Sequence, residues 1–530
     1  MLKLEKSLFY TLLLLALSLI VFPKYYITGD GASHTYNAKV LFDVVLNQDR
    51  DFYKEFYVIN RSIDPNWMSH LLIGFFTRFM PPWLADKCFQ LIYVLVFTFG
   101  FRYMIRSIEK SNSFLSLLFF PFLFTLPFQQ GFYNYCFSLA LFFWTIGYYL
   151  RKRHEIEHAV YQFVLSILLL MTAFSHGMPA IYAMMLIMLV WLAENYKYFI
   201  PFDIRRNAQA LSRLSLIMLP AAFMILLFLA KRGTGTVPHP WSLGKKLIQF
   251  LSFWTSQSTR YEEIYPAIAS AVLLLLCMLV LLFTRMKVNI SKHMSIGFVF
   301  LFMILFTFIS YLNCPHSIGG AGSIDIRLGF LPPLFLLFYF ATKLWSDVSR
   351  TIFMAATLII SVTFLVIRFP YVMRANNIGK EIMTASPFIN DHSVVLNLHM
   401  DDWQQIGKGD SLFHHDGSFI HFSDFIGAEK HLIMIMNYEA EINYFPVNWQ
   451  ALKNPRESIP AMIPGIYPPT GDFQLYEKQI GRKLDYVLIQ NWRKKPSADQ
   501  AFLQTMTLIE RNFTKIYESP NSAVLVYQRR

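Results

Sequence analysis

The chain has 530 residues, of which 55% are hydrophobic, 17% aromatic and only 15% charged. Soluble domains average about 45–50% apolar and 25% charged residues, so a soluble globular protein is disfavoured, and the 52 Phe and 28 Tyr residues argue against disorder. The net charge of +13 does not indicate nucleic acid here, because membrane proteins carry such an excess on cytoplasmic loops and beside phospholipid headgroups. Four scattered cysteines without a CxxC spacing indicate neither a thiolate metal site nor a disulfide framework.

Eleven apolar runs predict eleven membrane spans, since a helix needs about 20 residues to cross a bilayer of about 30 Å. The first run follows Lys3 and Lys6 and lacks a small-x-small cleavage site, so it is predicted to be an uncleaved helix and not a signal peptide. The predicted spans are residues 8–22, 88–105, 113–127, 131–150, 158–174, 177–193, 211–230, 264–284, 294–312, 326–344 and 350–368.

Basic residues collect in every second loop between these runs. The positive-inside rule then places the N-terminus and those loops in the cytoplasm, and an odd number of spans places the C-terminal portion outside. The basic groups are Arg102/Arg106/Lys110, Arg151/Lys152/Arg153, Lys197/Arg205/Arg206, Arg285/Lys287/Lys292 and Lys343/Arg350. The missing cleavage site and the lack of cysteine in the C-terminal portion favour a bacterial inner membrane with a periplasmic domain.

Residues 371–530 are less apolar than the rest of the chain. Runs such as SVVLNLHM and LDYVLIQNW, separated by Pro, Gly, Asn and Asp, predict strands. The predicted fold class is therefore mainly α: a polytopic helical bundle over 1–370, with a long first outer loop at 23–87, followed by a soluble α/β or α+β domain over 371–530.

The first outer loop opens with polar residues directly after the first span. Asp30 stands between Gly29 and Gly31, and His34 and Asn37 follow at helical spacing. Two glycines permit a tight turn that presents the carboxylate. An alternative is that Asp30 only caps the helix that begins near His34, since Asp is a favoured cap.

The stretch 66–79 in the same loop is too polar to span a membrane. Asn66, His70 and Thr77 fall on one side of a helical wheel, so the stretch is predicted to lie along the membrane interface with its apolar side down. The alternative of a poor second span conflicts with the alternation of loop charges.

Further polar residues follow later spans on the outer side. Arg327 stands at the mouth of an apolar helix, where a guanidinium can form a charge-assisted fork to a phosphate; a simple pairing with Asp325 or a headgroup is the alternative. The others include Gln129, Gln130, Asn134, His176, His239, Glu262, Glu263 and His316. Their convergence predicts an outward-opening cavity suited to chemistry on a lipid phosphate. No P-loop, GxSxG, HExxH or Rossmann pattern supports other enzyme classes.

This layout resembles the GT-C superfamily of integral-membrane glycosyltransferases, which includes protein O-mannosyltransferases and lipid A aminoarabinose transferases. The resemblance covers roughly residues 1–370 and rests on Asp30 in GDGASHTYN, the stretch 66–79 and the Asp325/Arg327 turn. One departure is that protein mannosyltransferases carry an adjacent acidic pair where this chain has Asp30 and Gly31.

The resemblance implies transfer of a sugar from a polyprenyl-phosphate donor to a lipid, glycan or protein acceptor on the outer side. Asp30 would be the catalytic base and Arg327 the phosphate holder, with Lys231, Arg232 or Arg260 as further cations. No cofactor is certain, and a divalent metal is left open. The substrate-binding candidates are His34, Asn37, Asn66, His70, Glu262, Glu263, His316, Asp325 and Arg327. The alternatives are a lipid or polysaccharide transporter and a noncatalytic scaffold of envelope assembly.

Overall fold

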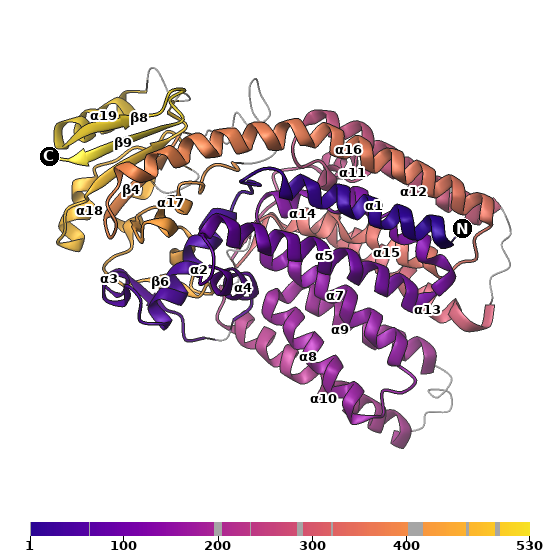
Figure 1. Cartoon of the computed structure of the whole chain (residues 1–530). Coiled ribbons are helices and arrows are strands. Elements are labelled where there is room, and N and C mark those ends of the chain that lie inside the picture. The colour runs from indigo at the N-terminus through magenta and orange to yellow at the C-terminus, as the bar shows by residue number, and fades with distance from the viewer. Residues whose placement is uncertain are drawn as a thin grey trace.

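The computed structural model consists of a helical bundle and a five-stranded sheet at opposite ends of the molecule (Figure 1). It describes residues 2–62, 64–195, 204–233, 235–283, 290–319, 322–400, 417–462, 466–492, 495 and 499–530. The N-terminus lies at the end of the bundle far from the sheet, and α16 (Asp347–Ile382) runs along the bundle toward the sheet. Helix α16 therefore connects the bundle to the sheet.

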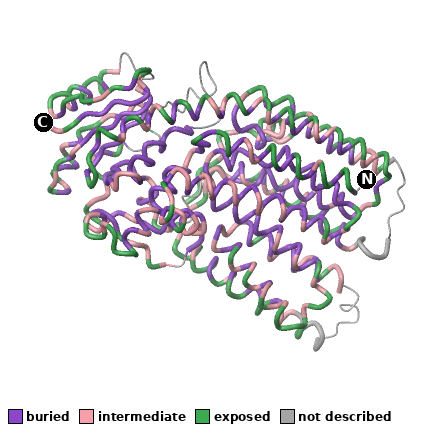
Figure 2. The backbone as a smooth tube through the Cα atoms, viewed as in Figure 1, coloured by how far each residue is buried: buried purple, intermediate pink, exposed green. Residues whose placement is uncertain are grey.

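The bundle helices occur where the apolar runs predict them. Besides α16 they are α1 (Leu2–Val21), α5 (Pro82–Ile108), α7 (Tyr133–Lys152), α8 (Ala159–Ser175), α9 (Gly177–Asn195), α10 (Ile204–Ala230), α12 (Ile264–Phe283), α13 (Ile290–Asn313), α14 (Ile324–Gly329) and α15 (Leu331–Ala341). The outward faces of the outer helices are exposed (Figure 2) and carry large apolar side chains such as Leu216, Phe223 and Ile359, as lipid contact requires.

Among the described residues, eight helices are long and apolar enough to cross a membrane, or nine if one bent pair counts as a span. This number is smaller than the eleven predicted. The remaining two predicted spans are α7, which begins with Tyr-Asn-Tyr and ends with Arg151 and Lys152, and α8, which has only 17 residues. Of the basic residues used to predict the orientation, Lys197, Arg285 and Lys287 lie outside the described residues.

The predicted third span, residues 113–127, is not one straight helix. It consists of the 3-10 helices η1 (Lys110–Ser116) and η2 (Phe120–Phe122) and the short α6 (Leu126–Gln129), with a bend of 48° between its two halves. Pro121 and Pro127 each stand at the start of a new turn, because proline lacks the N–H that would continue the preceding helix. An apolar count alone does not detect this break.

The first outer loop folds into α2 (Gly31–Val45), α3 (Arg50–Lys54), β1 (Tyr57–Ile59) and α4 (Met68–Phe76). Helix α4 is shorter than the predicted stretch 66–79 and packs against α2 and α5. Asn66 lies before α4 with a φ of 76°, so the predicted single helical face of Asn66, His70 and Thr77 is not formed.

The C-terminal sheet has the strand order β5-β4-β7-β9-β8. Strand β4 pairs in parallel with β5 and β7, whereas β9 is antiparallel to β7 and β8. The bounds are β4 (Val394–His399), β5 (Ile433–Met434), β7 (Tyr486–Gln490), β8 (Phe513–Glu518) and β9 (Val524–Arg529). The helices of this region are α17 (Asp424–Glu429), α18 (Phe473–Ile480) and α19 (Gln500–Asn512).

The first outer loop shares a hydrophobic core with the C-terminal region. Tyr36, Tyr53 and Tyr57 of the loop belong to the same buried cluster as β4, β7 and β9, and β1 pairs antiparallel with β6 (Val447–Trp449). A second core fills the bundle. The loop and the tail thus form one body at the end of the bundle where β1 and the sheet lie, and residue 371 falls inside α16.

Candidate functional site

A cavity of about 960 Å³ lies where the outer loops meet the C-terminal region. Its walls come from segments that follow the first, third, fifth, seventh and ninth predicted spans, and from the tail beyond α16. The residues that represent these segments are Asp30, Gln130, His176, Arg232, Ser323, Arg327, His421 and Tyr438. Since all these loops meet in one cavity, they lie at the same end of the bundle, as the alternation of the predicted spans requires.

Asp30 is held at the wall of the cavity by the backbone. The amides of Gly29 and Asp30 donate to the carbonyls of Gln129 and Gln130 at 2.8 and 3.0 Å. Asp30 is the N-cap residue of α2, but its side chain makes no cap hydrogen bond, and 24% of that side chain is exposed. The capping alternative is therefore not realised, and the carboxylate is available to the cavity.

The glycines beside Asp30 are required by close packing. Neither has a positive φ. A Cβ on Gly29 would lie 2.7 Å from the carbonyl oxygen of Gln130, and a Cβ on Gly31 would lie 2.4 Å from Thr28 Oγ1 and 2.5 Å from the Tyr133 hydroxyl. The predicted turn is present at residues 29 and 30, but both positions need glycine because neighbouring segments approach closely and not because of a positive φ.

We expect Gly31→Ala to lower the free energy of unfolding by about 1–3 kcal/mol, the usual effect of an overpacked site. The added methyl would separate the Thr28 and Tyr133 hydroxyls, which lie 2.9 Å apart. Gly244→Ala is the matched control, since a Cβ there meets no atom within 4 Å. Thermal unfolding of the purified variants measures the effect, and equal midpoints for both variants would contradict this account.

Asp30 is surrounded by groups that affect its proton affinity. Burial raises its pKa to about 6. Three neighbours lower it in part: the charges of His34 and Arg327, and a hydrogen bond from Tyr438. The imidazole of His421 lies 3.9 Å away, and burial lowers the pKa of His421 to about 3, which leaves that ring neutral. A carboxylate with a pKa near neutrality is suited to accept a proton.

Two arginines line the same cavity. Arg327 stacks over Phe132 at 4.4 Å and donates to the carbonyl of Gly322 at 2.9 Å, and Arg232 stacks over Tyr444 at 4.2 Å. No ion pair between Arg327 and a carboxylate occurs within the described part of the chain, so the predicted alternative of an Asp325 partner is not formed. These guanidiniums make this part of the cavity attractive to an anion.

The cavity continues between apolar side chains of the bundle. Ile181, Tyr182 and Met185 of α9, Ile225, Phe228 and Leu229 of α10, and Phe306 of α13 line this part. The site therefore combines a carboxylate, two cations and an apolar passage between helices, which is the composition that an amphiphilic ligand with a charged head requires.

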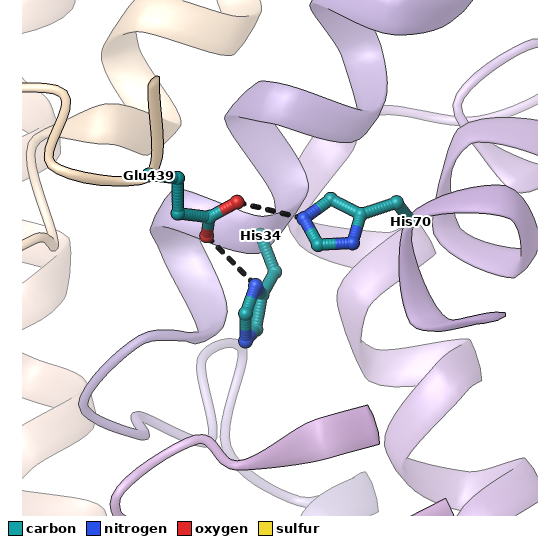
Figure 3. A group of neighbouring side chains, drawn as sticks. All are labelled: His34, His70 and Glu439. Atoms are coloured by element: carbon teal, nitrogen blue, oxygen red, sulfur yellow. Dashed lines mark hydrogen bonds and ion pairs between the residues drawn. The ribbon is translucent and has the colours of Figure 1, made fainter. Parts of the chain in front are cut away.

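Behind the Asp30 wall, His34 and His70 both contact Glu439 (Figure 3). His34 Nδ1 lies 2.7 Å from Glu439 Oε1, and His70 Nε2 lies 2.7 Å from Glu439 Oε2. All three residues are buried. Although burial opposes ionisation, the two imidazoles hold the pKa of Glu439 well below its ordinary value, so Glu439 is a carboxylate.

Of the predicted site residues, Asp30, His34, Asn66 and Arg327 line the cavity. His70 lies behind it with Glu439, and Asn37 forms a reciprocal amide pair with Asn437, both hydrogen bonds being 2.9 Å. The remaining predicted residues do not line this cavity: Glu262, Glu263, His316 and Asp325. Of the further cations, Lys231 instead pairs with Asp64 at 3.0 Å, and Arg260 pairs with Glu262 at 3.3 Å.

Glu263 has a structural role. Its carboxylate accepts hydrogen bonds from the amides of Ser258 and Thr259 and pairs with Arg368 of α16 at 3.0 Å, with both charged side chains at most 1% exposed. The ion pair of Glu263 and Arg368 therefore connects α16 to the loop that precedes α12. The predicted role of Glu263 in substrate binding is therefore not supported by its position.

Glu263→Gln is expected to lower the free energy of unfolding by about 3–5 kcal/mol, because it leaves the Arg368 charge buried without a counter-charge. The neighbouring Glu262→Gln is the control: its side chain is 48% exposed, and we expect a change within about 0.5 kcal/mol. Denaturation midpoints in detergent compare the two. A loss in Glu263→Gln as small as the loss expected for Glu262→Gln would show that the buried pair contributes little to stability.

Three tail residues of the site were not predicted from the sequence. Tyr438, Glu439 and Tyr444 reach the cavity region although they lie about 400 residues beyond Asp30. They follow β5, and ligand groups in sheet domains commonly stand after strand ends. The position of NYEAE directly after the run KHLIMIM was the available signal.

No protein-family model matches the sequence, and no curated protein matches it. The structure is similar to a solved structure described as the crystal structure of ArnT from Cupriavidus metallidurans bound to undecaprenyl phosphate. The match covers 99% of this chain and 97% of that chain, at 8% sequence identity and a TM-score of 0.44. The likeness is one of overall arrangement, and no residue role is taken from it.

Proposed function

We propose that this protein is an integral-membrane glycosyltransferase of the GT-C type, which uses a polyprenyl-phosphate sugar as donor. The observation that carries the proposal is the cavity, in which Asp30 shares one space with Arg327, Arg232 and an apolar passage between α9, α10 and α13. A prenyl chain suits the apolar passage, and a phosphate suits the guanidiniums.

In the proposed reaction, Asp30 accepts the proton of an acceptor hydroxyl as the hydroxyl oxygen attacks the anomeric carbon of the sugar. The bond from that carbon to the phosphate oxygen breaks, and the electron pair leaves with the phosphate. Arg327 and Arg232 stabilise the charge of the departing phosphate, which needs electrostatic stabilisation more than protonation. Attack from the face opposite the leaving group inverts the anomeric centre.

The proposed orientation follows from the loop charges. The positive-inside rule puts the N-terminus in the cytoplasm, and the cavity end of the bundle, with the domain proposed over 371–530, then faces the outside. We propose a bacterial inner membrane with a periplasmic domain. The acceptor is a lipid, a glycan or a protein that carries a nucleophilic hydroxyl.

A transporter would concentrate ionisable groups near the middle of the membrane. Asp30, Arg232 and Arg327 instead lie at or beyond helix ends, after α1, after α10 and in α14. A noncatalytic scaffold would have no need of a raised pKa at Asp30. The cavity therefore favours a transferase over both alternatives.

The test is lipid mass spectrometry on cells that lack the protein, complemented with wild type or Asp30→Asn at matched expression. We expect a polyprenyl-phosphate sugar to accumulate in the deletion strain and in the Asp30→Asn strain, and to disappear with wild type. The mass of the lipid identifies the sugar class. An Asp30→Asn strain that behaves like wild type would contradict the proposed base, and no accumulating donor in the deletion would contradict the transferase.

A further inference from the structure

The cluster of His34, His70 and Glu439 combines residues from three separate segments, α2, α4 and the 3-10 helix η8 (Glu439–Glu441). Their ligand-type atoms all lie within 4.8 Å of one another. We propose that this cluster (Figure 3) is a binding site for one divalent transition-metal ion, with zinc as the best match. Metal binding at this cluster does not depend on the proposed transferase activity.

The position of the proton on His34 is determined by its neighbour. His34 Nε2 lies 3.0 Å from the carbonyl oxygen of Gly131. A carbonyl only accepts hydrogen bonds, so Nε2 carries a proton, and in the neutral form of the ring Nδ1 presents a lone pair. A backbone carbonyl that receives the second N–H is the usual support of a metal-ligating histidine.

The lone pair of His34 faces a carboxylate. Nδ1 lies 2.7 Å from Glu439 Oε1, and within the described chain neither atom has another hydrogen-bond partner. Two lone pairs at this distance repel each other, so a positive species belongs between them. A proton on Nδ1 would form an ion pair, and a metal ion would use both atoms as ligands.

The charge of the cluster favours the metal ion. Glu439 is fully buried, and its ion-pair contacts in the described regions are with His34 and His70, without a lysine or arginine. A buried carboxylate is costly unless a positive charge compensates it, and without a metal ion that charge would have to come from a protonated imidazole. A divalent cation supplies the missing charge and uses the lone pairs of both imidazoles at once.

The donor set determines the class of metal. Two imidazole nitrogens and one carboxylate are a recurrent zinc set, and also suit iron(II), whereas magnesium and calcium prefer oxygen ligands throughout. Zinc bonds of about 2.0–2.2 Å at tetrahedral angles hold ligand atoms about 3.3 Å apart. The two contacts of 2.7 Å would therefore each open by about half an ångström on binding. His34 lines the cavity, which offers the ion a route of entry.

A second histidine cluster provides a negative control. His239, His316 and Asp325 also lie together, but His239 Nδ1 accepts a hydrogen bond from the Trp241 amide at 3.1 Å. The proton of a neutral His239 is then on Nε2, the nitrogen that faces Asp325, and a protonated nitrogen does not ligate a metal. Asp325→Asn should therefore leave the metal content unchanged.

The experiment uses the full chain in detergent, stripped with a chelator and then dialysed against zinc chloride and against zinc-free buffer. Elemental analysis should find about one zinc per chain, and thermal unfolding should occur at a higher temperature in the zinc-loaded protein. Glu439→Gln and His70→Asn should lose the zinc. Asp325→Asn and His154→Gln, a change on an exposed histidine of the loop before α8, should retain it.

If the wild-type protein holds no zinc after loading, the proposal is overturned in favour of an ion pair. If Glu439→Gln holds as much zinc as the wild type, the zinc site lies elsewhere and the proposal is also overturned. If the two cluster variants do not fold, X-ray absorption at the zinc edge of the wild type decides. Two imidazole nitrogens and a carboxylate oxygen are expected in the zinc shell. A shell with sulfur or with oxygen alone would overturn the assignment.

Discussion

Asp30→Asn is expected to slow sugar transfer by about 10²–10⁴-fold, the usual contribution of a general base. The amide has nearly the same size as the carboxylate but does not accept the proton of the acceptor hydroxyl. Because the Asp30 side chain makes no cap hydrogen bond, the variant should fold as the wild type does. Turnover at saturating donor, measured with the lipid identified in the deletion strain, gives the loss in rate.

A measurement of donor binding distinguishes loss of the base from a general loss of function. Asp30→Asn removes a negative charge from the cavity, so a polyprenyl monophosphate should bind to the variant at least as tightly as to wild type. Asp391→Asn is the matched control, because Asp391 is 54% exposed and pairs with Lys430, and its turnover should be unchanged. Full turnover by Asp30→Asn would exclude Asp30 as the base.

The pH dependence of the reaction follows from the same group. Burial raises the pKa of Asp30 to about 6, and the charge of Glu439 adds to this, whereas His34, Tyr438 and Arg327 act against it. The base acts in its ionised form, so kcat/KM should rise with pH to about 6 and then level off. In the folded protein this carboxyl retains its proton above the ordinary pKa of about 3.9. Its contribution to stability therefore decreases as the pH rises between these two values.

The sequence predicted the helical positions of the bundle and one essential feature of the site. Apolar runs and alternating loop charges place Asp30 and Arg327 at the same end of the bundle, and both do line one cavity. The helix positions and their orientation can be predicted because a bilayer imposes a fixed helix length and a bias in loop charge. Strands β4 and β7 were also predicted from their apolar runs.

Other features depend on contacts that one sequence does not reveal. Glu439 meets His34 and His70 only through the fold of the tail, and the closeness of Gly31 to Tyr133 is a property of tertiary packing. Glu263 looks like a polar residue of the outer face, but Arg368, about 100 residues later, turns it into an internal anchor. Strand β8 escaped prediction because it is mostly exposed, with little apolar alternation.

Arg327→Gln is expected to weaken binding of a polyprenyl monophosphate by about 10–150-fold, the equivalent of a hydrogen bond to a charged group at about 1.5–3 kcal/mol. Binding of the corresponding polyprenol, which lacks the phosphate, should hardly change. Arg327 has no carboxylate partner among the described residues and stacks on Phe132, so its charge is available to a ligand.

Arg327→Lys tests whether geometry matters as well as charge. Lysine retains the charge but not the planar fork, so it should recover only part of the affinity. Arg456→Gln is the control, since Arg456 is 62% exposed and pairs with Glu441 away from the cavity lining.

Turnover should fall in Arg327→Gln by about 10²–10³-fold, as when one stabilising donor of a developing charge is removed. Because the affinity for the phosphate lipid falls here but not in Asp30→Asn, the two variants separate anion binding from proton transfer. Equal losses for the phosphate lipid and the polyprenol would show instead that Arg327 supports the cavity by packing.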